Sequence, residues 1–305
     1  MSTRSRESTA LGYALAAVAA WSTVATGFKL GLRVLEPVQL LLLGSVVSAL
    51  LFAVLATAGG HWRLPPRGQP TSATRPLSHR LVQVAAFGLL NPVLYYLVLF
   101  EAYDRLPAQI AQPLNYTWAI TMALLAVPVL GQRLTRNTLA GIAISYLGVV
   151  VLLTRGSLHG WSDLDWLGVV LALGSTVLWA GYWLANARSA MPPLTLMAWS
   201  FLLATPVLAA ACYLGPGWPS ITLETLGYGA WVGLIEMGFT FLLWQRALRL
   251  SAHAARIGQL IFLSPFLSLV LIATVLGEAI HATSVIGLAV IIAGLWVSRR
   301  EPAQG

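Results

Sequence analysis

The residue of this sequence best suited to chemistry is a glutamate in the middle of an apolar segment. Glu236 lies near the centre of residues 224–247, which are otherwise mostly apolar. At the centre of a membrane helix an ionised carboxylate costs at least about 2.5 kcal/mol. We therefore expect Glu236 to face the interior of a helix bundle. There it either couples to a proton or contacts a cation, or it is a protonated group hydrogen-bonded to a neighbouring helix.

Amide and aromatic side chains recur at helical spacing in other apolar segments. Gln112, Asn115 and Tyr116 occupy positions i, i+3 and i+4, which share one helix face. Such amides either bond the polar groups of a small molecule or tie two helices together, whereas aromatic rings stack on its apolar part. The residues predicted to bind a substrate are Trp21, Asn91, Tyr95, Gln112, Asn115, Tyr116, Trp179, Tyr182, Glu236, Gln259 and Phe262.

The sequence lacks the motifs of ATP-driven motors, hydrolases and metal sites. Lys29 is the only lysine, so there is no P-loop, and neither His-Glu-x-x-His nor Gly-x-Ser-x-Gly occurs. The five histidines are scattered without metal-ligand spacing. We therefore expect no catalytic residue, no metal and no cofactor, and we do not expect an enzyme.

The composition indicates which elements position these side chains. Of the 305 residues 58% are hydrophobic and 9% are charged, whereas soluble domains carry about a quarter charged residues. The apolar residues form stretches long enough to cross a bilayer as helices. The predicted fold is an all-α polytopic membrane protein with ten spans, at residues 10–32, 37–58, 80–101, 107–130, 137–154, 164–187, 194–214, 224–247, 252–276 and 280–298.

The positions of the basic residues that give the formal charge of +8 are explained by membrane topology and do not indicate a nucleic-acid site. With ten spans and the N-terminus inside, fourteen of the 18 basic residues lie on the inner side, and Lys29, Arg33, Arg105 and Arg155 lie outside. The positive-inside rule then places both termini in the cytoplasm. We expect a multi-pass protein of a cell inner membrane. Residues 59–80, rich in Pro, Gly, Ser and Thr, are predicted to form a mobile cytoplasmic loop.

The two halves of the sequence repeat each other. LGQRLTRNTLAGIAISYLGVVVL begins at Leu130 and LGEAIHATSVIGLAVIIAGLWV begins at Leu276; each has Gly eleven and eighteen positions after its first Leu. Pro37 and Pro193 each precede a span, 156 positions apart. We therefore predict a five-helix repeat in residues 1–156 and another in 157–305. Five is an odd number, so the second repeat enters the membrane from the opposite side.

The glycines of this repeat are predicted to serve helix packing. Gly141 and Gly148, like Gly287 and Gly294, are seven positions apart and recur on nearly one helix face. Glycine on a membrane helix lets another helix approach closely. Glu278, beside a predicted helix end, is expected to be solvated or to cap a helix, and a functional role is the alternative.

The Leu-Gly-Glu at Leu276 with its following glycines, its twin at Leu130 and the ten spans resemble the drug/metabolite transporter superfamily, in its EamA-like branch. Within that branch the chain is most similar to the YddG-type aromatic amino-acid exporters. The resemblance covers nearly the whole chain and implies ten helices around a central cavity. Gln132 stands where the second repeat has Glu278, so no shared carboxylate role is expected there.

The sequence thus predicts an inner-membrane transporter that exports small metabolites by alternating access. The resemblance implies amino acids, including aromatic ones, as cargo. The expected partners are this small-molecule substrate, either amino acids or related amphipathic metabolites, and membrane lipids, without nucleic acid; the oligomeric state stays open. Organic cations, nucleosides and sugars are alternative cargo, and a membrane receptor or scaffold is the alternative without transport.

Overall fold

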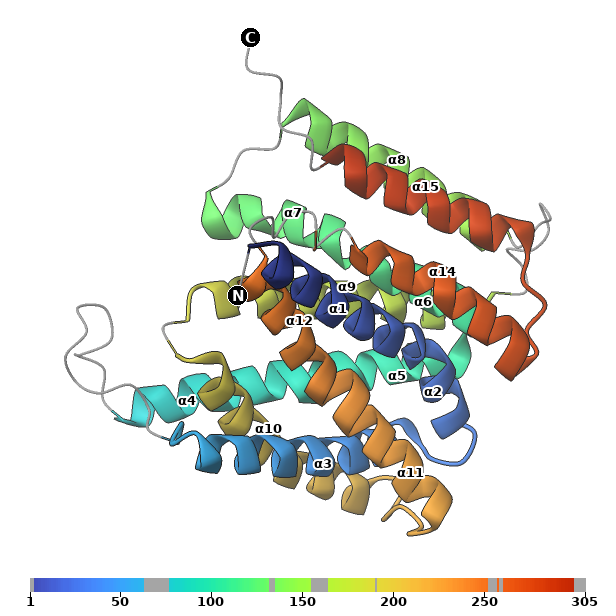
Figure 1. Ribbon diagram of the computed structural model, residues 1–305. Coiled ribbons are helices and arrows are strands. Elements are labelled where there is room, and N and C mark those ends of the chain that lie inside the picture. Colours follow the sequence, from blue (N-terminus) through green and yellow to red (C-terminus); the bar gives the residue numbers. More distant parts are fainter. Residues whose placement is uncertain are drawn as a thin grey trace. The chain divides into compact units, whose positions relative to one another are not determined.

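The computed structural model describes residues 3–62, 77–131, 135–154, 164–189, 191–251, 257 and 260–298, and all regular secondary structure in these ranges is helical. Figure 1 shows the helices in chain order. Most of the predicted loop 59–80, together with Gln132 and the predicted binding residue Gln259, lies outside the described residues. Helix covers most of every range predicted from hydropathy.

Contacts divide the chain into two compact units, and each unit draws on both halves of the sequence. Unit 1 comprises Met1–Leu97 and Arg188–Ser264, and unit 2 comprises Val98–Ala187 and Pro265–Gly305. Unit 1 holds α1 (Thr3–Ser22), α2 (Val24–Gly31), α3 (Pro37–Ala58), α4 (Leu77–Gly88), η1 (Leu89–Leu94), the start of α5 (Tyr95–Arg105), α10 (Pro193–Leu214), α11 (Leu223–Trp231), η2 (Val232–Phe239), α12 (Thr240–Leu250) and η3 (Leu260–Leu263).

Unit 2 holds the rest of α5, α6 (Ala108–Tyr116), α7 (Trp118–Leu130), α8 (Arg136–Leu153), α9 (Trp166–Ala187), α14 (Ser264–Leu271) from its second residue, η4 (Ile272–Leu276) and α15 (Ala282–Ser298). Here η1, η2 and η4 are π-helical segments and η3 is a 3-10 helix.

Seven helices of the described residues are long and apolar enough to cross a membrane: Arg6–Gly31, Pro37–Ala58, Leu81–Arg105, Arg136–Leu153, Trp166–Asn186, Pro193–Leu214 and Leu223–Leu250. Two further apolar helices, Leu260–Leu276 and Ala282–Ser298, are shorter. The predicted span 107–130 is interrupted at Thr117, between α6 and α7. The chain is therefore a multi-pass membrane protein whose described residues form helices and no strands.

Prolines and glycines set several helix ends at matching positions of the two sequence halves. Pro37 opens α3 and Pro193 opens α10, because proline lacks the N–H that a first turn leaves unpaired. Gly131 ends α7 with φ +68°, and Gly277 ends η4 with φ +70°. A left-handed residue is favourable only for glycine, so both helices stop there.

In unit 1, α3 packs against α10 (Figure 1), and it also packs against η2. The rings of Phe52 and Phe201 lie 5.5 Å apart between α3 and α10. A methyl group on Gly233 would meet the carbonyl oxygen of Gly44 at 2.5 Å, and one on Gly88 would meet that of Ser200 at 2.7 Å. Gly88 precedes Gly233 by 145 positions, and Gly44 precedes Ser200 by 156 positions. The two pairs therefore stand at corresponding positions of the predicted repeats, and one close helix contact occurs twice in this unit.

In unit 2, α8 and α15 pack side by side along their lengths (Figure 1). Gly148 faces Gly287 and Gly141 faces Gly294, so the helices run antiparallel. The hydroxyl of Ser145 donates to a carbonyl oxygen of α15 at 3.0 Å. The predicted packing role of these four glycines is confirmed, since each faces backbone of the other helix.

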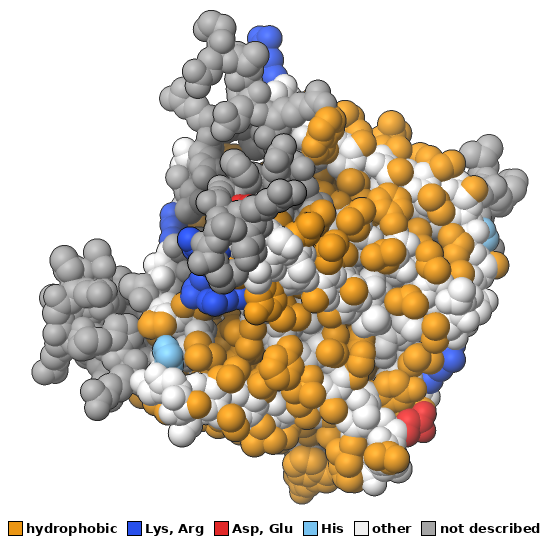
Figure 2. Space-filling model, viewed as in Figure 1, with side chains coloured by type: hydrophobic (Ala, Val, Ile, Leu, Met, Phe, Trp, Pro, Cys, Tyr) orange, Lys and Arg blue, Asp and Glu red, His pale blue; other side chains and the backbone are white. Residues whose placement is uncertain are grey.

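The face of unit 1 that Figure 2 shows is rich in apolar side chains. Figure 2 shows hydrophobic side chains along α3 and α11, while the charged side chains in this part of the view lie near helix ends. Leu50 and Val54 of α3 are 62% and 66% exposed. Extended exposed apolar surface of this kind is stable against lipid rather than water, in agreement with membrane-spanning helices.

Candidate functional site

Two helices of unit 1 lose regular α-geometry at matching positions of the sequence halves. Asn91 lies in η1 with non-helical backbone angles (φ −147°, ψ 116°), and Glu236 lies in η2, 145 positions later. Asn91 directly precedes Pro92, and proline is a common cause of a break in helical geometry. Broken or wide helical turns free backbone groups inside a membrane protein and are common at transport sites.

Glu236 contacts a tyrosine of the broken helix. The hydroxyl of Tyr96 donates a hydrogen bond to Glu236 Oε1 at 3.0 Å. Tyr96 is 1% exposed, and its ring meets that of the predicted residue Tyr95 edge-on at 4.7 Å. Glu236 itself is half-buried. Tyr96 is absent from the predicted binding residues, because only the folded chain reveals which of two adjacent tyrosines reaches the carboxylate.

Buried polar oxygens without a partner accompany this pair in unit 1. Asn91 Oδ1, Thr26 Oγ1 and Thr240 Oγ1 are buried and make no hydrogen bond within the described part of the chain. Thr240 follows Glu236 by four residues, about one helical turn. Nearly all buried polar atoms in proteins are hydrogen-bonded, so unpaired ones indicate water or a ligand.

Aromatic rings line a second part of unit 1. Trp21 of α1 meets Phe241 and Trp244 of α12 edge-on, with ring centroids 5.6 Å apart in both pairs. The α1–α12 contact therefore fixes the predicted residue Trp21 against two rings. Phe262, also predicted, lies half-buried in η3.

In unit 2 the predicted amides lie on α6, next to α9. The Asn115 side chain donates to Ser175 Oγ at 3.0 Å, which is the hydrogen bond between helices that the sequence left as the alternative. Gln112 is 4% exposed, and its Oε1 makes no hydrogen bond among the described residues. Tyr116 is half-buried at the end of α6. Gln112 is therefore the predicted amide of α6 whose carbonyl oxygen stays available.

The aromatic stripe on α9 forms a compact cluster. Trp179 stacks on Tyr182 with centroids 5.7 Å apart and planes 19° apart, and it meets Trp183 edge-on at 5.8 Å. Offset stacking and edge contacts are the favourable geometries for aromatic pairs. The predicted residues Trp179 and Tyr182 thus present one ordered apolar surface.

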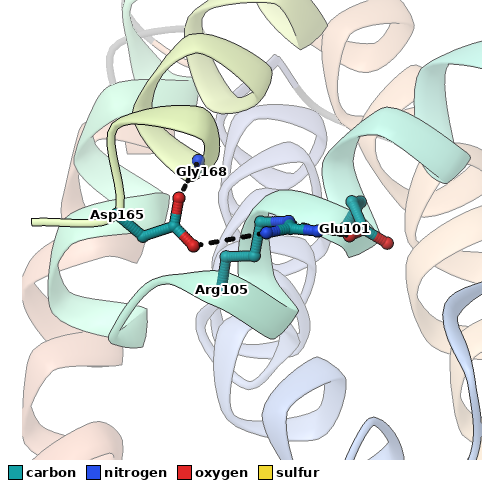
Figure 3. A network of polar contacts seen from close by, with 4 residues as sticks. All are labelled: Glu101, Arg105, Asp165 and Gly168. Atoms are coloured by element: carbon teal, nitrogen blue, oxygen red, sulfur yellow. Dashed lines mark hydrogen bonds and ion pairs between the residues drawn. The ribbon is translucent and has the colours of Figure 1, made fainter.

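At one end of unit 2 an arginine bridges two carboxylates (Figure 3). Arg105 donates to Glu101 at 2.8 Å and to Asp165 at 3.4 Å, and the Gly168 N–H donates to Asp165 at 3.0 Å. The Gly168 N–H, and after it the Arg105 guanidinium, hold the pKa of Asp165 below its usual value. Because these side chains are about one-third exposed, their ion pairs add little stability.

Glu278 caps a helix, as the sequence predicted. Its carboxylate accepts from the backbone N–H groups of Ala108 at 2.9 Å and Gln109 at 3.3 Å, the first residues of α6. Gln109 in turn accepts from the Ser284 hydroxyl at 2.8 Å. A negative group at a helix N-terminus pairs with otherwise unsatisfied N–H groups, so Glu278 has a structural role.

Relatives of the chain are transporters. The chain is 28% identical over 208 residues to the aromatic amino acid exporter YddG of Ancylobacter novellus, covering 67% of this chain and 71% of that protein. It is 28% identical over 218 residues to a probable amino-acid metabolite efflux pump of Salmonella typhimurium, covering 63% and 68%. An uncharacterized transporter of Archaeoglobus fulgidus is 25% identical over 288 residues, covering 93% and 95%.

A solved structure with a similar fold and a family model that matches the sequence give the same classification as these relatives. A solved crystal structure with 22% identity matches the fold with a TM-score of 0.64 and covers 96% of both chains. The EamA-like transporter family matches the chain twice, over residues 8–154 and 166–300. The chain therefore belongs to the EamA-like transporter family and is a membrane transporter, not an enzyme.

Proposed function

We propose that this transporter exports amino acids, including aromatic ones, from the cytoplasm by alternating access. The observation that carries the proposal is the Tyr96–Glu236 pair together with the unpaired oxygen of Asn91, all on interrupted membrane helices of unit 1. A carboxylate and amide oxygens suit an α-ammonium group. Two of the relatives are named as an aromatic amino acid exporter and a probable amino-acid metabolite efflux pump, which supports the same cargo.

Each unit offers a different chemistry to an amino acid. Unit 1 supplies the acceptors Glu236 and Asn91, with Trp21 as an apolar surface. Unit 2 supplies the Trp179–Tyr182 stack for an aromatic side chain, and the unpaired carbonyl oxygen of Gln112 as a further acceptor for an ammonium group. In the proposal Tyr95, Asn115, Tyr116, Gln259 and Phe262 complete the binding residues.

We further propose that ten spans form two inverted repeats, residues 1–156 and 157–305, with both termini in the cytoplasm of a cell with an inner membrane. Support comes from contacts that recur at the repeat offset. The contact of Gly44 with Gly233 recurs between Ser200 and Gly88. The antiparallel α8–α15 pair agrees with the same relation. The Ser145 hydroxyl donates to the carbonyl oxygen of Ile291, and Ile291 occupies in the second repeat the position that Ser145 occupies in the first. Inverted repeats supply the two exchangeable gates that alternating access needs.

Organic cations are a second candidate cargo. A carboxylate inside a membrane helix and ordered aromatic rings are the groups that bind a planar cation. A flat cation has no carboxylate, so the acceptor Glu236 and the aromatic rings are the groups that suit it, whereas a donor for a carboxylate is not needed. Competition between amino acids and such a cation separates the two candidates.

The test is exchange of radiolabelled cargo by the purified chain in proteoliposomes. Vesicles preloaded with unlabelled phenylalanine, tryptophan, methionine or threonine receive the labelled compound outside, and empty liposomes serve as control. We expect saturable uptake that unlabelled amino acids compete. No uptake of any of the four by folded protein, combined with uptake of an aromatic cation, would replace the first candidate with the second.

A further inference from the structure

We propose that an apolar groove in the surface of unit 1 binds one acyl chain of a phospholipid. The groove lies between α3 and α10 and is closed at one end by residues 215–222, which connect α10 to α11. Its volume is about 430 Å³, within the range of about 300 to 1,000 Å³ that ligand-binding pockets have. None of its lining residues belongs to the candidate transport site. They include Leu42 and Val46 of α3, Thr205 and Ala209 of α10, and Trp218 and Ile221 of the connection.

Small side chains on α10 leave this groove open. Farther along the two helices, the rings of Phe52 and Phe201 fill the space between α3 and α10, with their centroids 5.5 Å apart. Toward the connection 215–222, α10 instead presents Thr205 and Ala209, whose short side chains leave a hollow beside α3. The hollow is therefore a consequence of residue size at two positions of one helix face, four residues apart.

The groove lies within the depth of one membrane leaflet. The start of α3 and the end of α10 lie on the same side, because Gln39 Nε2 donates to the carbonyl oxygen of Gly217 at 3.1 Å. Val46 follows the first residue of α3 by nine positions, and Thr205 precedes the last residue of α10 by nine, which is about 13.5 Å along either helix. Half of a hydrocarbon core is about 15 Å. In the orientation proposed above, this half is the outer leaflet.

The lining offers no partner to a polar ligand inside the groove. The hydroxyl of Thr205 donates to the carbonyl oxygen of Phe201 at 2.8 Å, so it is satisfied within its own helix. None of the buried polar atoms that lack a partner in the described part of the chain belongs to a lining residue. An ordered water needs about two to four polar partners, and an amino acid needs partners for both of its charged groups. An apolar occupant is therefore favoured.

The groove is continuous with the surface that lipid covers. Its wall residue Val46 is 37% exposed, and the exposed Leu50 and Val54 follow it along the same membrane-crossing helix. An empty hollow would forfeit the dispersion contacts of its lining, so a neighbouring acyl chain gains contacts by entering it. Trp218, 61% exposed at the closed end, suits the membrane–water interface, where tryptophan is enriched. The headgroup of the same lipid then stays at the interface.

The size of the groove favours a flexible chain over a helix of a second protein. A helix about 10 Å across rises 5.4 Å per turn, so each turn occupies about 420 Å³. The groove therefore accommodates about one turn, whereas a helix that crosses a membrane has about twenty residues to pack. An unbranched acyl chain rotates about each of its bonds and can follow the hollow between the two helices.

The test is photo-crosslinking of the full chain in nanodiscs that hold one copy each. The discs contain phosphatidylethanolamine with a diazirine near the end of one acyl chain, and mass spectrometry quantifies the labelled peptides. We expect residues 205–221 to take up at least about 5-fold more label than residues 50–54, which carry exposed apolar side chains outside the groove. Equal labelling of the two segments would mean ordinary bilayer contact and would overturn the proposal.

Two phenylalanine substitutions on α10 serve as matched variants. Ala209→Phe places a ring in the groove and should lower the label of residues 205–221 at least about 5-fold, with the label of residues 50–54 unchanged. Val207→Phe, exposed on the same helix but outside the lining, should leave both labels unchanged. The same effect in both variants would contradict a groove site. The labelling pattern of the unchanged chain decides the matter even if Ala209→Phe fails to fold.

Two further arms identify other occupants. Loss of the groove label in discs that hold two copies of the chain would make the groove an interface between copies. Displacement of this label by saturating phenylalanine, with residues 50–54 still labelled, would make it a cargo site. Either result would overturn the lipid proposal, and an unchanged label in both arms is expected. None of these measurements requires transport, so failure of this proposal leaves the proposed function standing.

Discussion

Replacing Gly148 with alanine should push α8 and α15 apart. A methyl group there would lie 2.7 Å from the carbonyl oxygen of Gly287 and 2.7 Å from the backbone N of Ile291. Ordinary contacts of this kind begin near 3.4 Å, so the helices must separate by roughly 0.7 Å. Both obstacles are backbone atoms, which cannot rotate out of the way as a side-chain tip can.

The cost of this separation is that of overpacking a closely fitted contact, about 1 to 3 kcal/mol. That range corresponds to an unfolding equilibrium constant raised about 5-fold to 150-fold. The hydrogen bond from Ser145 to the carbonyl of Ile291, 3.0 Å long, crosses the same contact and would lengthen as the helices part.

Reversible unfolding in mixed micelles, followed by far-UV circular dichroism, measures the effect. The matched control is Gly174→Ala on α9 of the same unit, where nothing lies within 4 Å of the added methyl group. Alanine favours helix over glycine, so the control should be neutral or more stable. Equal stability of Gly148→Ala and Gly174→Ala would refute the close packing of α8 on α15.

Three further changes test the remaining contacts. The lowered pKa of Asp165 means that its carboxylate stabilises the fold above the unfolded pKa and loses this effect as the pH falls through the folded value. The melting temperature of the unchanged protein should therefore fall more between about pH 5 and about pH 3 than that of Asp165→Asn; parallel curves would contradict the Gly168 bond. Glu278→Ala removes the acceptor of the first N–H groups of α6 and should cost about 0.5 to 2 kcal/mol in chemical unfolding, whereas Glu224→Ala should cost less. Trp179→Ala should raise the KM for tryptophan about 2-fold to 13-fold while sparing threonine, and an equal rise for both would argue against a stacking role.

The helices of this fold were predictable because a bilayer imposes length and polarity on the sequence. Long apolar stretches must be helical in lipid, so hydropathy located every range in which the structure has helix. Pro37 and Pro193 marked two helix starts, and glycines seven residues apart marked the close face of α8 and α15. Helix ranges, helix starts and glycine spacing depend only on residues that are close together in the sequence or that share one face of a single helix, so the sequence is enough to predict them.

The side-chain pairs of the candidate site were not predictable from the sequence. Tyr96 and Glu236 are 140 positions apart, and Asn115 and Ser175 are 60 apart, so only the packing of helices decides that they meet. The sequence placed Glu236 in an apolar segment but gave no signal for the π-helical turns of η2. Glu278 was recognised as a possible cap, whereas its target, the start of α6, depends on the fold.

The most direct test of the account is exchange of labelled phenylalanine by three proteins in parallel proteoliposomes: the unchanged chain, Glu236→Gln and Glu224→Gln. The account predicts saturable exchange by the unchanged chain and by Glu224→Gln, and a loss of at least about 10-fold in Glu236→Gln. Exchange by folded Glu236→Gln at the rate and KM of the unchanged chain would contradict the central claim that Glu236 holds the ammonium group of the cargo.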